Sequence, residues 1–220
     1  MKLVHALWGP GDLLGDPART GLRSAGATRI QVNLADAAVA GALLRLTTFE
    51  EPVAAVVATE VPDEAAGARV SAVLTGFAGR VAGWWVEEHL PLPPPAVPPG
   101  ERAPGLANIA FLRRPAELPY AEWRSAWLEH HTAVAIETQA TFGYVQNLVL
   151  GPATDGAPEL AAIVEELFPI EALTDPHAFY GSGGDDAELH RRSGRMLRSV
   201  ATFGADRDLD VVPTSRYLLG

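Results

Sequence analysis

A proline-rich segment in the middle of the chain constrains its fold more than any other feature. Seven of the 18 prolines lie between Pro91 and Pro104 in a chain of 220 residues. Proline lacks a backbone N–H and has a fixed φ, so this run can neither donate to a sheet nor continue a helix. We therefore predict a stiff, extended linker over 91–105 that joins a domain at 1–90 to another at 106–220.

The elements expected on the two sides of this linker follow the same order. Alternating or short apolar runs predict strands, and apolar residues at helical spacing predict helices. In the first half, strands are expected at 2–8, 28–34, 53–61 and 80–90, with helices at 13–24 and 62–77. In the second half, strands are expected at 106–113, 142–150, 160–168 and 209–219, with helices at 120–138 and 185–203. Each half thus has the β-α-β-β-α-β order of a ferredoxin-like unit.

The doubled order also predicts how the two halves meet. A sheet with helices on one face must find a partner for its other face, and each half can be that partner. We therefore predict an α+β chain in which two tandem ferredoxin-like units form an intramolecular dimeric α/β-barrel. The first unit is expected to be degenerate because Gly15, Pro17 and Gly21 interrupt its first helical pattern. Any pocket is therefore expected in the second half.

Composition excludes several classes of function. The chain has no cysteine, which rules out disulfides, thiol nucleophiles and thiolate metal sites. Lys2 is the single lysine, which argues against Schiff-base chemistry. A net charge of −10 disfavours nucleic acid as a partner. With no run of 18 apolar residues, no secretory signal and no metal-ligand spacing of histidines, we expect a cytoplasmic protein that uses neither membrane, metal nor cofactor.

The segment 120–138 carries the clearest functional signal. On a helical wheel, Trp123 and Trp127 lie at the centre of the apolar face, and His130 and His131 lie at its two margins. Two interpretations are open for the histidines. They are either flank residues whose ring nitrogens are satisfied by the backbone or a carboxylate, or neutral imidazoles that reach a pocket lined by the tryptophans and transfer protons there.

The next expected strand, 142–150, carries three polar side chains in an apolar run. Tyr144 and Gln146 share one face of the strand, and Asn147 lies on the other. Whichever face meets the helices buries at least one polar group, and a cavity with a ligand is one way to satisfy it. The alternative is a tyrosine hydroxyl that reaches solvent at the end of the sheet.

Paired carboxylates occur twice on expected strands, at Glu87-Glu88 and at Glu165-Glu166. Adjacent strand residues point to opposite faces, so one glutamate of each pair is expected to point inward. An inward carboxyl with a raised pKa can act as a general base, although strand ends that reach solvent explain the same pattern.

Two other motifs favour structural roles. The run 181–184, Gly-Ser-Gly-Gly, lacks the Gly-Lys-Ser/Thr of a phosphate loop, and Asp185 with Glu188 after it is typical of a helix start. Arg191, Arg195 and Arg198 share one helix face and are expected to form a solvated basic stripe rather than an anion site.

The stretch Phe111–His131 resembles the EthD domain family. The family pattern is a strand that ends in Arg-Arg-Pro, a short turn, and a helix with Trp-x-x-x-His, which are matched here by 113–115 and by Trp127 with His131. Gln146-Asn147 on the next strand is also similar to the family pattern. The resemblance covers about 108–150 and extends more loosely to Tyr217. The chain departs from the family at Ala133, where a proline often stands.

This resemblance implies a dimeric α/β-barrel relative of proteins that accompany degradative or polyketide pathways. Related barrels include cofactor-free isomerases, cyclases and monooxygenases that act on lactones and aromatic polyketides. With the residues above, it suggests a cofactor-independent enzyme that transfers a proton on an apolar carbonyl, lactone or aromatic polyketide-like substrate, as an isomerase, cyclase or lyase. The rival hypothesis is a non-catalytic small-molecule binder or accessory protein.

The hypothesis assigns a role to each candidate residue. His131 is the expected acid/base, and His130 is its substitute. Apolar rings would pack on the tryptophans, and polar side chains would orient a carbonyl or phenol oxygen. The expected partner is an apolar or aromatic small molecule, and a homodimer is left open. The expected site comprises catalytic His131, His130 and Tyr144, and substrate-binding Trp123, Trp127, Gln146, Asn147 and Glu166.

Overall fold

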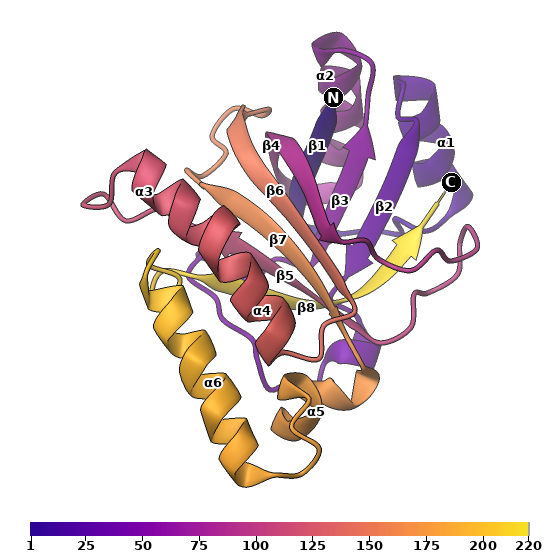
Figure 1. Ribbon diagram of the computed structural model, residues 1–220. Coiled ribbons are helices and arrows are strands. Elements are labelled where there is room, and N and C mark those ends of the chain that lie inside the picture. The colour runs from indigo at the N-terminus through magenta and orange to yellow at the C-terminus, as the bar shows by residue number, and fades with distance from the viewer. Residues whose placement is uncertain (220) are drawn as a thin grey trace.

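The computed structural model describes residues 1–219, and the first half contains the predicted elements in the predicted order (Figure 1). A short 3-10 turn, η1 (Ala37–Val39), lies in the long loop after its second strand. The elements are β1 (Lys2–Pro10), α1 (Asp16–Ala25), β2 (Arg29–Leu34), β3 (Ala55–Glu60), α2 (Glu64–Thr75) and β4 (Ala78–Leu92). The first helix begins three residues later than expected, with a proline in its first turn, where a missing N–H costs nothing.

The second half repeats this order, with one helix that differs from the prediction. The helix expected at 120–138 contains a π-helical segment, η2, because its middle residues bond at wider spacing than an α-helix. Two short helices also precede the last long helix. The elements are β5 (Leu106–Leu112), α3 (Tyr120–Arg124), η2 (Ser125–His131), α4 (Thr132–Thr138), β6 (Gly143–Pro152), β7 (Ala162–Phe168), η3 (Ile170–Leu173), α5 (Pro176–Tyr180), α6 (Asp186–Ala201) and β8 (Asp210–Leu218).

All eight strands form one closed antiparallel barrel in the order β1-β3-β2-β8-β5-β7-β6-β4. Two seams join the halves, because β2 pairs with β8 and β4 pairs with β6. Closure pairs the strand edges that each half would otherwise expose. The prediction of two ferredoxin-like units that form an intramolecular α/β-barrel is therefore confirmed.

Strand alternation divides the core into an inner and two outer layers. An apolar cluster inside the barrel includes Trp84 and Phe111. Outside it, α1 and α2 cover the strands of the first half, and α3, α4 and α6 cover those of the second half (Figure 1). Under α2 the packing is tight: a Cβ at Gly67 would lie 2.4 Å from the Trp85 ring. A tryptophan thus fills the space between helix and sheet in the first half.

The proline-rich segment crosses one end of the barrel. The strand β4 runs into it as far as Leu92, two residues further than predicted. Beyond Pro98, the backbone follows the end of β8, with the N–H of Gly100 bonded to the carbonyl of Leu218 and that of Ala103 bonded to Arg216. The linker is therefore extended and also anchored to the sheet. Within residues 1–219, none of the helices has the length and apolar character needed to cross a membrane.

Candidate functional site

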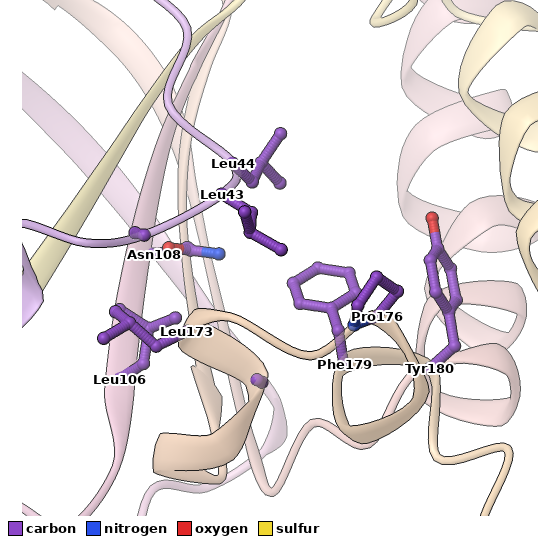
Figure 2. A pocket seen from close by; sticks show the side chains of 10 residues that line it. Leu43, Leu44, Leu106, Asn108, Leu173, Pro176, Phe179 and Tyr180 are labelled. Carbon is purple, nitrogen blue, oxygen red and sulfur yellow. The ribbon is translucent and has the colours of Figure 1, made fainter. Parts of the chain in front are cut away.

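A cavity of about 300 Å³ lies in the second half between the outer face of the sheet and its helices. Its floor comes from β5, β6 and β7, and its walls from η2, α6 and the loop 42–46 of the first half. A neighbouring cavity of about 220 Å³ shares four lining residues with it: Leu44, Asn108, Phe179 and Tyr180 (Figure 2). The two hollows are therefore adjacent parts of one apolar region, as predicted for the second half.

Three polar side chains form a row across the floor of this cavity. Register places Asn108 of β5 opposite Glu166 of β7, and Glu166 opposite Tyr144 of β6. All three line the cavity. Directly opposed residues on neighbouring antiparallel strands have Cβ atoms only about 5 Å apart, so the three groups can act on one ligand.

The carboxyl group of Glu166 has a buried oxygen that no hydrogen bond compensates for the loss of water. Its Oε1 atom is shielded from solvent and has no hydrogen-bond partner among the described residues. Burial raises the pKa of this carboxyl to about 7. A carboxyl that titrates near neutrality in an apolar cavity can both take up and release a proton at physiological pH. Glu166 was expected from the sequence to bind substrate, and this electrostatic setting suits it to proton transfer.

Tyr144 and Asn108 flank this carboxyl with groups that can donate hydrogen bonds. Burial, together with the charge of Glu166, raises the pKa of Tyr144, so its hydroxyl keeps its proton. Asn108 is 3% exposed, and its Oδ1, an acceptor, lacks a hydrogen-bond partner in the described part of the chain, whereas its Nδ2 is the group that can donate to a ligand. Both can therefore orient an oxygen atom of a ligand beside Glu166.

His131 reaches the same cavity from the end of η2. Its Nδ1 is 2.9 Å from the Ser199 hydroxyl of α6, and its ring lies 4.7 Å from the ring of Phe203. Burial lowers the pKa of His131 to about 4, so the imidazole is neutral at pH 7. A neutral imidazole can donate a hydrogen bond to a developing oxyanion but is a weaker base than Glu166.

The structure separates the two neighbouring histidines and the two tryptophans. His131 lines the cavity, whereas His130 is exposed and does not. Trp127 lines it, and Trp123 stacks on Trp127 from behind with ring centroids 5.1 Å apart. The expected roles of His130 as substitute base and of Trp123 as a substrate contact therefore lack support from their positions.

Gln146 and Asn147 lie outside the cavity lining as well. Gln146 donates to the Thr132 hydroxyl at 3.0 Å and so ties β6 to α4. Asn147 points to the other face of the strand and donates to the carbonyl of Ile163. Each amide thus has an internal hydrogen bond that ties β6 to a neighbouring element, although the Oδ1 of Asn147 has no partner among the described residues.

Four polar residues that line the cavity were not expected from the sequence, namely Asn108, Gln139, Tyr180 and Asp206. Asn108 stands in the apolar run of β5, where a single polar residue is a usable signal once the face of the strand is known. Gln139 lies at the end of α4 with its Oε1 unpartnered among the described residues. Tyr180 is the last residue of the short helix α5, which the sequence pattern does not predict. Burial and the charge of Glu166 both raise the pKa of Tyr180.

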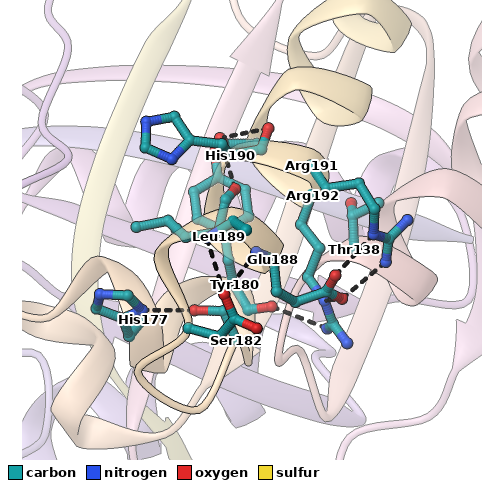
Figure 3. Close-up of polar contacts among 12 residues, drawn as sticks. Thr138, His177, Tyr180, Ser182, Glu188, Leu189, His190, Arg191 and Arg192 are labelled. Carbon is teal, nitrogen blue, oxygen red and sulfur yellow. Dashed lines mark hydrogen bonds and ion pairs between the residues drawn. The ribbon is translucent and has the colours of Figure 1, made fainter.

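Polar contacts at the junction of α5 and α6 place Tyr180 (Figure 3). Arg192 donates to the carbonyl of Tyr180 at 2.9 Å and to the carboxylate of Glu188 at 2.6 Å. His177 and Ser182 are hydrogen-bonded at 2.7 Å on the other side of the turn. The predicted roles of the glycine run and Asp185 are confirmed, since Gly181 and Gly183 adopt positive φ and Asp185 caps α6.

The described residues contain no group of three or more His, Asp or Glu side chains placed to hold a metal ion. The site therefore offers a carboxyl, a neutral imidazole, a phenol and amides in an apolar surrounding. Such groups can bind an apolar molecule with an oxygen function and move a proton on it.

Comparison with known proteins gives matches at the level of structure. No family model matches the chain, and no curated protein matches its sequence. A solved structure of a "putative monooxygenase" from Lactobacillus acidophilus is similar with a TM-score of 0.51 and 10% identity over 99% of this chain and 94% of the other. An anthrone oxidase-like protein is similar with a TM-score of 0.52 and 10% identity over 100% and 93%.

These similarities extend over whole chains, including both halves and the linker between them. At 10% identity they show a shared fold and leave the reaction to the residues of each site. The chain thus has the α+β dimeric α/β-barrel fold that it shares with these two proteins.

Proposed function

We propose that this chain is a small-molecule enzyme that moves a proton on an apolar carbonyl, lactone or aromatic polyketide-like substrate. The observation that carries the proposal is the Glu166 carboxyl, which has an unpartnered oxygen and a pKa of about 7 inside an apolar cavity. Catalytic bases work best when their pKa lies near the operating pH. The roles differ from those first expected, because His131 is the weaker base.

The proposed reaction starts with the substrate ring beside Trp127 and its carbonyl oxygen near Tyr144 and Asn108. The Glu166 carboxylate takes a proton from the carbon next to the carbonyl. The electron pair of that C–H bond forms a C=C bond to the carbonyl carbon, and the π pair of the C=O bond moves onto the oxygen. Hydrogen bonds from Tyr144 and the neutral His131 stabilise the enolate. In a substrate with a C=C bond beside that carbon, the enolate is conjugated, and Glu166 returns the proton to the far carbon of the conjugated system, which shifts the double bond and gives an isomer.

Two further observations support an enzyme of this kind. Strongly perturbed pKa values of neighbouring groups in a cavity are typical of functional sites. The two similar structures are named for monooxygenation and for anthrone oxidation, and this analogy of fold favours an aromatic or polyketide-like ligand. The resemblance of 111–131 to the EthD family also favours an aromatic or polyketide-like ligand. We propose that the chain belongs to that family.

The test is exchange of substrate hydrogens with deuterated water, measured by NMR on a panel of aromatic ketones, anthrones and lactones. Glu166→Gln keeps the shape of the side chain and removes the base, so the exchange rate should fall by about 10²–10⁴-fold. The matched control is Glu171→Gln, an exposed glutamate outside the cavity lining, which should keep the wild-type rate.

A non-catalytic binder is the second candidate, favoured by the apolar lining that Trp127 and Phe203 give the cavity. It predicts ligand binding without exchange in the wild type, and equal affinity in Glu166→Gln. That result, or exchange that survives in Glu166→Gln, would contradict the proposed enzyme.

A further inference from the structure

A second polar site lies inside the barrel, on the opposite face of β7 from Glu166. Glu165 points inward there and is paired with Arg216 of β8 at 3.2 Å. It also accepts hydrogen bonds from Gln31 and Asn33 of β2 at 2.9 Å. The carboxylate at the centre of this cluster is therefore fully matched.

Arg216 is less well matched than its partner. It is 3% exposed and donates from Nη2 to Gln31 at 2.9 Å. Its Nη1 is buried and has no hydrogen-bond partner among the described residues, and its Nε is within ion-pair distance of Glu165 but also makes no hydrogen bond. A buried guanidinium N–H without an acceptor is costly, so a ligand oxygen that reached this N–H would be bound favourably.

A cavity of about 230 Å³ adjoins Arg216 at the mouth of the barrel. Its apolar part comes from Leu90, Val145, Leu218 and the linker residues 93–96, which cross this end of the barrel. Its polar part comes from Arg216, Arg29, Gln31 and Glu88. The cavity therefore has a cationic corner and an apolar roof.

The charges around this mouth decide which ligand fits. Glu88 pairs with Lys2, Glu60 pairs with Arg29 at 3.2 Å, and Glu165 pairs with Arg216. Each of these three acids is already paired with a cation. The polar group that still lacks a partner is the Nη1 N–H of Arg216, which is a hydrogen-bond donor. The corner accordingly suits an anionic oxygen and not a cation.

We propose that the barrel mouth binds a small organic carboxylate, with its carboxylate on Arg216 and its apolar body under the proline segment. This site is separate from the cavity of Glu166, because the two lie on opposite faces of the sheet. It would make the proline-rich segment a binding element as well as a linker.

Hexanoate is a suitable probe, with hexanamide as its uncharged analogue and inorganic phosphate as an anion without an apolar body. Calorimetry on the full chain should show one hexanoate bound per chain, and the two analogues should bind at least about tenfold more weakly. In NMR spectra, hexanoate should shift the Arg216 Nε–H and the Val145 amide. Equal binding of hexanamide, stronger binding of phosphate, or no binding of hexanoate at millimolar concentration would overturn the proposal.

Two variants test whether hexanoate binds at this cavity. Arg216→Met should weaken hexanoate binding by about tenfold or more, but it also leaves Glu165 unpaired in the barrel and can impair folding. Ala96→Trp avoids this problem, because the exposed alanine lines the cavity and the indole would fill it. It should weaken binding to a similar degree at an unchanged melting temperature.

The controls separate this site from the surface and from the Glu166 cavity. Arg198→Met and Ala187→Trp alter exposed residues of α6 and should leave hexanoate affinity unchanged. Glu166→Gln should leave it unchanged too, whatever it does to deuterium exchange. Unaltered affinity in Ala96→Trp, or a loss in Glu166→Gln, would contradict a site at the barrel mouth.

Discussion

At the scale of single residues, the neighbouring carboxylates Glu165 and Glu166 of β7 lie in opposite environments. Glu165 points into the barrel and meets an arginine and two amides, whereas Glu166 points outward into an apolar cavity. The sequence predicts that adjacent glutamates diverge, because strand side chains alternate. It cannot predict which one lacks a partner, since the partners come from β2 and β8, far away in the chain.

The pH dependence of exchange follows from the state of Glu166. The base form is the carboxylate, and its pKa is about 7. We expect the rate to rise with pH through about 7 and then to level off. The pKa of His131 is about 4, so the imidazole stays neutral over this range and adds no second transition. A pH–rate profile with its midpoint at the ordinary value of a glutamate would contradict this assignment.

Glu166 should also reduce stability at alkaline pH. Its pKa is raised on folding, so the folded chain binds more protons than the unfolded chain between pH 4.5 and about 7. Stability is therefore lost as the pH rises through this window, by up to about 3 kcal/mol. Glu166→Gln should unfold at higher urea than the wild type at pH 8 and at similar urea at pH 4. Equal midpoints at pH 8 would show that the carboxyl is solvated.

At the scale of elements, the helix of 120–138 and the loop after β2 build the cavity in different ways. The sequence pattern predicts the helix and its apolar face, and it leaves the histidines undecided because η2 departs from the regular wheel. The loop has no periodicity to interpret. The structure shows that it crosses to the second half, where Leu46 pairs with Val211 of β8.

Asp210 anchors this loop and should control the cavity from a distance. Its carboxylate accepts hydrogen bonds from the backbone N–H of Thr48 and of Phe49, and it pairs with Arg113 at 2.7 Å. Burial tends to raise the pKa of Asp210, but these hydrogen bonds outweigh it and the pKa is lowered. The Arg-Arg-Pro motif thus supplies an anchor through Arg113.

Asp210→Asn should lower the free energy of unfolding by about 1–3 kcal/mol, because Arg113 and the loop N–H groups lose a charged acceptor. The wild type should lose this advantage as the pH falls through the lowered pKa of Asp210. Limited proteolysis should cut the variant faster within 42–49, and Asp155→Asn at an exposed position should match the wild type. Unchanged cleavage would show that the loop holds without Asp210.

At the scale of the whole molecule, two seams hold the halves together, and inside the barrel Gln31 and Asn33 of the first half donate hydrogen bonds to Glu165 of the second. The doubled element order predicts the architecture, because each sheet needs a partner for its inner face. The pairing of β2 with β8 and of β4 with β6 closes the barrel. The order of these contacts cannot be read from periodicity, which reports only local faces.

Cutting the linker tests this cohesion. A protease site inserted between Pro95 and Ala96 would separate the chain into two pieces without breaking either seam. We expect the cut protein to elute as a single complex in gel filtration, with a melting temperature that falls on dilution, since association then becomes bimolecular. Separation into two species at micromolar concentration would show that the linker, rather than the seams, holds the barrel closed.

The pairing of Gly67 with Trp85 in the first half has an evolutionary consequence. In a barrel made of two identical subunits, a mutation that fills one cavity fills both, and the activity is lost. Once both halves lie in one chain, each can diverge under its own selection. A tryptophan against a glycine occupies the helix–sheet space of the first half, while Glu166 keeps an open cavity in the second. With both halves in one chain, the first half can thus pack its helix–sheet space tightly and lend its loop 42–46 as a wall of the cavity in the second half.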